Sequence, residues 1–170
     1  MEIWDVYDSD RIKTDRTIVR GEPIAKGDHH LTVHVCILNT KGQMLIQKRD
    51  ERKKVFPSKW DVTAAGSALS GETSRSAAER ELYEELGIKL VLPERSYAFS
   101  VGFPTGFDDF YIVKLEADIS SLTLQAEEVS DARWASLPEV FEMIDDGSFI
   151  PYRKHLISLI FEGMNSIYKD

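Results

Sequence analysis

The segment between residues 74 and 86 constrains this chain more than any other, because it predicts a helix with both ends marked. Thr73 or Ser74 can cap the first turn with a side-chain oxygen. Gly87 stands where a residue in the left-handed conformation commonly ends a helix. We therefore expect a helix from about Ser74 to Leu86.

Three glutamates of this helix share one face. An α-helix turns by about 100° per residue, so positions i, i+3 and i+4 point the same way. The residues at these positions are Glu81, Glu84 and Glu85, beside an apolar stripe of Ala78, Leu82 and Leu86. Such close like charges disfavour the helix, and a bound cation reverses that effect. Mg²⁺ and Mn²⁺ prefer oxygen ligands of this kind, so the helix predicts a metal site.

A solvated acidic helix face is the alternative explanation, and for a bare Glu-x-x-Glu-Glu it would be the better one. Two flanking features favour a site. Gly66 and Gly71 bracket the loop that enters the helix, and they permit close approach of the backbone to a ligand or metal. Glu72 and Arg80 flank the acids, and an ion pair between them could fix the loop against the helix.

Length, composition and charge limit the classes of protein that this chain can form. Its 170 residues, 42% apolar and 29% charged, are typical of one globular domain. A net charge of −8 argues against gripping a nucleic acid by bulk charge. Cys36 is the single cysteine, the first ten residues do not form a signal peptide, and no apolar run could span a bilayer. We expect a cytoplasmic protein with neither nucleic acid nor membrane among its partners.

Hydrophobic periodicity elsewhere predicts a mixed order of strands and helices rather than a regular βαβ alternation. Strands are expected at 31–38 and 44–48 around a turn at 39–42, and at 60–63 before a loop from 64 to 72. Further strands are expected at 97–101, 110–115 and 131–134. One helix is expected to start after residues 136–138 and to end near residue 147, and another to run from about 152 to 168. Residues 1–28 form an expected arm, with a hairpin of 6–7 and 17–19, on a domain of residues 29–170.

The segment from Gly66 to Ile88 resembles the Nudix box, G-x5-E-x7-R-E-U-x-E-E-x-G-U, in which U is a bulky aliphatic residue. Every specified position is matched: Gly66, Glu72, Arg80, Glu81, Leu82, Glu84, Glu85, Gly87 and Ile88. The resemblance implies the Nudix fold, an α+β arrangement in which a mixed β-sheet is sandwiched between α-helices. It also implies hydrolysis of a diphosphate linkage in a small-molecule nucleoside diphosphate derivative or related organic pyrophosphate.

The resemblance assigns roles to matching residues. In the family, the matching glutamates bind Mg²⁺ or Mn²⁺, and the glycine can add its backbone carbonyl, so the implied metal ligands are Glu81, Glu84, Glu85 and Gly66. The residues matching Glu72 and Arg80 orient those ligands. The family often has an arginine near the end of the preceding strand that contacts substrate phosphate, and here Arg49 is that residue.

Residues 30–85 further resemble the branch related to type I isopentenyl-diphosphate isomerase. The shared residues are His30-Leu31, Asn39-Thr40-Lys41-Gly42, Lys48-Arg49, Pro57 and Trp60. That isomerase needs a cysteine just before the box region and a histidine shortly after it, and the matching stretch Thr63-Ala64-Ala65-Gly66-Ser67 has neither. Hydrolysis is therefore favoured, and an isomerase-like enzyme and a non-catalytic nucleotide-binding module are the alternatives.

A general base outside the box stays open at this point. Asp108 or Asp109, in an expected loop before a strand, and Glu127 or Glu128, before another, are the candidates. His34 is interpreted as a buried or half-buried strand residue rather than a metal ligand. The substrate and the phosphorus attacked are also open, and the N-terminal arm is compatible with a homodimer.

Overall fold

A computed structural model of the chain describes residues 2–92 and 98–163. The elements before the box helix are β1 (Ile3–Tyr7), β2 (Lys13–Val19), β3 (His30–Leu38), β4 (Gln43–Arg49), β5 (Trp60–Asp61) and β6 (Ala64–Ser67). The later ones are α1 (Ser74–Leu86), β7 (Phe99–Phe103), β8 (Gly106–Lys114), a short 3₁₀ helix η1 (Ile119–Ser121), β9 (Val129–Ser136), α2 (Leu137–Asp145) and α3 (Lys154–Glu162). The start expected for one strand at residue 97 and the end expected for the last helix at 168 lie outside the described residues.

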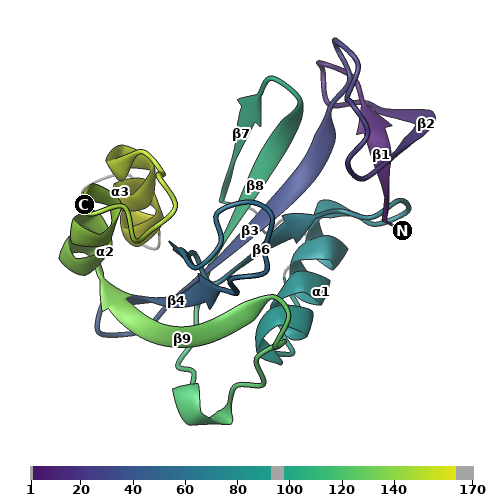
Figure 1. Ribbon diagram of the computed structural model, residues 1–170. Coiled ribbons are helices and arrows are strands. Elements are labelled where there is room, and N and C mark those ends of the chain that lie inside the picture. The colour runs from purple at the N-terminus through teal and green to yellow at the C-terminus, as the bar shows by residue number, and fades with distance from the viewer. Residues whose placement is uncertain (1, 93–97, 164–170) are drawn as a thin grey trace.

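Seven strands form one mixed sheet. Its central order is β5-β4-β3-β8-β7, with β6 also pairing with β3 and β9 with β4. The β3–β8 pair is parallel, whereas the other pairs of this sheet are antiparallel. Helix α1 lies on one side of the sheet, and α2 and α3 lie on the other (Figure 1). The expected α+β sandwich, a mixed sheet between α-helices, is therefore confirmed.

Strand β3 supplies both cores of this sandwich. Leu31, Val33, Val35 and Ile37 join the apolar cluster that contains the buried side chains of α1. Cys36 and Leu38 join the second cluster, with the buried side chains of α2 and α3. Successive side chains of a strand point to opposite faces of a sheet, so one central strand anchors helices on both sides.

The box helix has the predicted ends. The Thr73 hydroxyl accepts a hydrogen bond from the Ser76 N–H, and α1 runs from Ser74 to Leu86. Gly87 follows in the left-handed region with φ of 72°, and its N–H donates to the Tyr83 carbonyl. The apolar stripe of Ala78, Leu82 and Leu86 is fully buried, so the neighbouring acidic face is fixed against the sheet.

Two segments that we expected to be loops are strands. Residues 64–67 form β6 and pair antiparallel with β3, with Gly66 opposite Val33. Asp108 and Asp109 lie inside β8, which begins at Gly106 rather than near residue 110. Small and acidic residues carry no alternating apolar pattern, so only pairing with the central strand reveals these strands.

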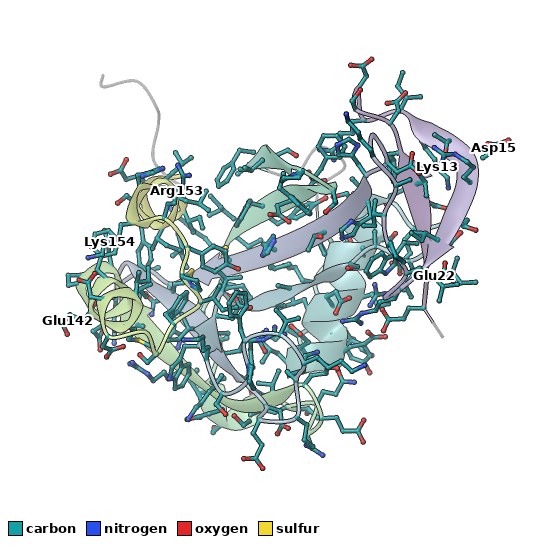
Figure 2. The ribbon with its side chains drawn as sticks, turned by 45° about the horizontal axis from the view of Figure 1, so that its top comes forward. Lys13, Asp15, Glu22, Glu142, Arg153 and Lys154 are labelled. Atoms are coloured by element: carbon teal, nitrogen blue, oxygen red, sulfur yellow. The ribbon has the colours of Figure 1, made fainter. Side chains whose placement is uncertain are left out.

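The N-terminal hairpin of β1 and β2 packs against the rest of the chain. Its strands pair antiparallel, so the expected hairpin is present, but its register differs: residues 17–19 lie opposite residues 3–5, and Tyr7 lies opposite Lys13. Trp4 stacks on His30 with ring centroids 4.5 Å apart. Asp5 accepts hydrogen bonds from the Ser70 hydroxyl at 2.8 Å and the Gly71 N–H at 2.9 Å, which ties the hairpin to the loop before α1. Figure 2 shows Lys13 and Asp15 of this hairpin at the opposite end of the molecule from α2 and α3.

Arg11 connects this arm to a buried carboxylate, which gives a first prediction. Its Nη1 lies 2.7 Å from Oδ1 of Asp109, whose side chain is fully buried. Replacing Arg11 by methionine removes the cation and leaves a buried charge, so we expect a loss of roughly 2–4 kcal/mol of unfolding free energy in urea titrations. Arg16→Met breaks an exposed pair with Asp28 and is the control, with a much smaller expected loss because solvent screens that pair. Equal losses in the two variants would contradict the prediction.

Candidate functional site

Gly66 of β6 lies in close contact with Glu81 of α1. The Glu81 carboxylate lies against the Gly66 α carbon so closely that an added Cβ would stand 2.0 Å from Oε1 and 2.1 Å from Cδ. Any side chain at this position would push the carboxylate away. The first glycine of the box is therefore required here by close packing of a glutamate on the backbone of β6.

Glu85 is a buried carboxylate held in place by two donors. It is 4% exposed, and its Oε2 accepts hydrogen bonds from the Gln47 side-chain amide at 2.8 Å and the Ala65 N–H at 3.1 Å. Burial raises the pKa of Glu85 to about 8, with a further contribution from the neighbouring Glu81. Burial also raises the pKa of Glu81, although Arg80 opposes that shift. Arg80 therefore offsets the cost of burying these two acids only in part.

Arg80 and Glu72 join the loop to the helix as predicted from their spacing. Arg80 donates to Glu72 from Nε at 2.7 Å and from Nη2 at 2.9 Å, and Nη2 also donates to the Ser67 carbonyl at 3.1 Å. Its Nη1 donates to Glu81 at 2.8 Å and to Glu84 at 3.0 Å. The guanidinium therefore fixes the loop and two of the three acidic side chains at once.

The donor set fits a hard divalent cation. In residues 2–92 and 98–163, no three acidic, histidine or cysteine side chains already converge in a metal-ligand arrangement. Instead, Nη1 of Arg80 lies between Glu81 and Glu84, where it partly neutralises them. Glu84 is more exposed than the other two acids, with 47% of its side chain accessible. The three carboxylates lie on one helix face, and the pKa values of Glu81 and Glu85 are raised. Mg²⁺ or Mn²⁺ bound there would stabilise the ionised form of these side chains.

These acids line a cavity of about 710 Å³ together with basic side chains. Glu81, Glu84 and Glu85 contribute carboxylates, and Arg49 and Lys53 contribute cations. Arg49 lies 3.4 Å from the buried Asp61 carboxylate and donates from Nε to the Val55 carbonyl at 3.2 Å. Burial lowers the pKa of Lys53, and the nearby Arg49 adds to that shift. The structure therefore brings the predicted Arg49 to the box acids and adds Lys53.

The candidate bases divide into two groups. Asp108 and Glu128 line the cavity, whereas Asp109 and Glu127 are not among its lining residues. Asp109 is fully buried beside Arg11, and Glu128 is bound by Lys53. An Oδ1 of Asp108 lies 3.2 Å from Nε2 of His34, although the alignment falls short of a hydrogen bond. Asp108 of the first pair and Glu128 of the second pair therefore face the cavity.

Three further polar residues near the cavity escaped the sequence interpretation. Tyr152 donates its hydroxyl proton to Oδ1 of Asp61 at 2.9 Å, and the same hydroxyl lies 3.4 Å from Nδ1 of His34. Burial raises the pKa of the Asp61 carboxyl. Gln47 orients Glu85 from β4. His34 is 8% exposed, as predicted for a buried strand residue, and it also lines the cavity. Because these residues lie outside the box, its spacing gave no signal for them.

Known proteins place the chain in a family. Residues 28–155 match the NUDIX domain. An uncharacterised Nudix hydrolase of Listeria innocua is 47% identical over 98% of this chain and 97% of its own length. Its counterpart in Listeria monocytogenes is 50% identical over 89% of this chain and 90% of its own length. The chain therefore belongs to the Nudix family and is a Nudix hydrolase.

Two more comparisons concern the fold and the branch. A crystal structure from Deinococcus radiodurans superposes with a TM-score of 0.76 at 23% identity, covering 96% of this chain and all of that one, which shows the shared fold. The isopentenyl-diphosphate Delta-isomerase of Shigella flexneri is 31% identical over 68% of this chain and 66% of its own length. Cys36 lies fully buried in the core between the sheet and α2 and α3, and burial raises its pKa.

Among the described residues, none of the helices has the length and apolar character needed to cross a membrane.

Proposed function

We propose that this Nudix hydrolase is a Mg²⁺- or Mn²⁺-dependent pyrophosphohydrolase that cleaves the diphosphate linkage of a nucleoside diphosphate derivative or a related organic pyrophosphate. The observation that carries the proposal is the shared cavity, in which the buried Glu85 and the half-buried Glu81 stand with Arg49 and Lys53. Carboxylates attract a divalent cation, and the two basic side chains attract phosphate oxygens. One cavity can thus hold both the metal and the diphosphate.

In this proposal, the chain's own residues bind and orient the reacting groups. Glu81, Glu84, Glu85 and the Gly66 carbonyl would hold the metal ion, which when bound would supply polarisation of phosphoryl oxygens and a lower pKa of the attacking water. Arg80 and Glu72 position those ligands through the hydrogen bonds between loop and helix. Arg49 and Lys53 hold the phosphate charge.

A general base is assigned to one of the two acids that face the cavity. Asp108 is the stronger candidate, because Glu128 is already engaged by Lys53. The Asp108 carboxylate lies in the cavity beside His34, where it can accept a proton from attacking water. We expect Asp108→Asn to lower kcat by about 10²-fold or more, and Asp109→Asn to have a smaller effect on kcat. Similar kcat losses from both substitutions would contradict this assignment.

A substrate panel tests the proposed activity. The purified protein is incubated with Mg²⁺ and, in turn, with nucleoside triphosphates, nucleotide sugars, dinucleoside polyphosphates and isopentenyl diphosphate. Reactions in ¹⁸O-labelled water, followed by ³¹P NMR, show which phosphorus receives the water oxygen. Cleavage of a diphosphate linkage that disappears with EDTA is the expected result. Isomerisation of isopentenyl diphosphate, or nucleotide binding without any turnover, would overturn the proposal.

The N-terminal hairpin contacts the rest of the chain through Trp4 and Asp5. We propose that residues 1–28 form an arm on a catalytic domain of residues 29–170, because Trp4 and Asp5 contact that domain. A homodimer through this arm and a cytoplasmic location stay predictions. Light scattering before and after removal of residues 1–28 measures the number of subunits. If that number does not change, the arm has no role in a dimer.

A further inference from the structure

A second, smaller cavity of about 400 Å³ adjoins the one that holds the box acids. The two cavities share the residues Arg20, Arg49, Lys53, Val55 and Glu128. The smaller cavity, called the basic pocket below, is completed by Arg52, Lys54 and Glu127. An anion that lies between the glutamates of α1 and the side chains of Arg49 and Lys53 can therefore extend directly into the basic pocket.

The basic pocket concentrates positive charge in an acidic protein. It is lined by five cationic side chains and two carboxylates, whereas the whole chain carries a net charge of −8. Burial and then the charge of Arg49 lower the pKa of Lys53, and Arg20 adds to the same shift. Cations crowded in this way gain from a polyanionic ligand, which relieves their mutual repulsion.

The cations of the pocket differ in how they are held. Arg52 is bound by Asp50 at 2.5 Å, and Lys53 is bound by Glu128. Arg20, at the base of the N-terminal hairpin, pairs with Glu2 at 2.8 Å and keeps 53% of its side chain exposed. Lys54 is exposed on the loop that follows β4. Arg20 and Lys54 can therefore contact a ligand without disturbing a buried pair.

We propose that the basic pocket binds a further phosphate group of the substrate, beyond the diphosphate that is cleaved. The substrate class is then an organic diphosphate that carries at least one more phosphate, either in line or attached to the departing group. This inference rests on the proposed function, because it assumes that the diphosphate lies between the box acids and Arg49. It also gives the N-terminal arm a role in selectivity through Arg20.

Binding without turnover tests this inference apart from hydrolysis. Calorimetry in EDTA and at fixed ionic strength compares inorganic tripolyphosphate with diphosphate, and NADP⁺ with NAD⁺. The first pair adds a phosphate in line, and the second adds a phosphate monoester elsewhere. We expect the extra phosphate to tighten binding by roughly tenfold in at least one pair. Because no reaction occurs in EDTA, the result does not depend on the catalytic proposal.

Substitutions at Arg20 and Lys54 test whether the extra phosphate binds in the basic pocket. Arg20→Gln with Lys54→Gln should reduce the gain from the extra phosphate to less than about twofold, while leaving diphosphate binding within about threefold of wild type. Lys54→Arg keeps the charge and should retain most of the gain. Lys114→Gln, at the end of β8 and outside both cavities, is the matched control. No gain in either pair, or a gain that survives in the double variant, would overturn the inference.

Discussion

Replacing Glu85 by glutamine is expected to lower metal-dependent hydrolysis by more than about 10²-fold and, at the same time, to stabilise the metal-free protein. Glutamine has nearly the same shape and keeps an oxygen that can accept from Gln47 or Ala65. It has no negative charge, so it cannot supply the charged ligand that a divalent ion needs. It also removes a carboxylate that is costly to ionise at 4% exposure.

The stability effect has a defined dependence on pH. The pKa of Glu85 is raised to about 8 in the folded protein from an ordinary value of 4.5. Between those pH values the folded state retains a proton that the unfolded state has released, so this group makes the protein less stable as pH rises. The contribution is complete above about pH 8, where Glu85→Gln should be more stable than wild type by about 1–3 kcal/mol in EDTA.

Urea unfolding in EDTA at about pH 5 and pH 8.5 measures the difference between Glu85→Gln and wild type. We expect a small difference at the lower pH and a larger one in favour of the variant at the higher pH. Added Mg²⁺ should stabilise wild type and leave the variant almost unchanged, because a ligand stabilises only the state that binds it. A variant that is less stable at both pH values, or as active as wild type, would contradict the assigned environment of Glu85.

Alanine at Gly66 is expected to damage the site much more than the fold. The added Cβ would stand 2.0 Å from Oε1 of Glu81, which is the end of a flexible side chain. The carboxylate can rotate away at little cost in folding, but it then leaves the position at which it could bind metal. We expect activity to fall by about 10²-fold and the Mg²⁺ concentration for half-maximal activity to rise. The unfolding free energy should change by less than about 1 kcal/mol.

Gly102→Ala is the matched control for that experiment. Gly102 lies on β7, where an added Cβ would meet Phe107 at the ordinary contact distance of 3.9 Å. It does not line either cavity. This variant should keep both its activity and its dependence on Mg²⁺. If Gly66→Ala also kept its Mg²⁺ dependence, the contact between Gly66 and Glu81 would not matter for catalysis.

Local patterns explain why the sequence predicted much of the fold. The regular spacing of Leu31, Val33, Val35 and Ile37 indicated β3, because every second side chain of a strand points to the same face and here to the same core. The cap and the terminal glycine defined α1 because they satisfy backbone groups within a few residues of each helix end. Residues 64–67 were misread as a loop, because β6 depends on pairing with a distant strand.

In the candidate site too, some residues were predicted from local sequence spacing and others were found only in the tertiary structure. Sequence spacing alone placed Glu81, Glu84 and Glu85 on one face of the helix, since helical geometry is periodic and local. Only the tertiary structure decided that Asp108 rather than Asp109 faces the cavity, because neighbouring side chains on a strand point to opposite sides of the sheet. It alone also brought Arg20, Lys53 and Tyr152 to the cavity that contains Glu81, Glu84 and Glu85, because their approach depends on how distant segments pack.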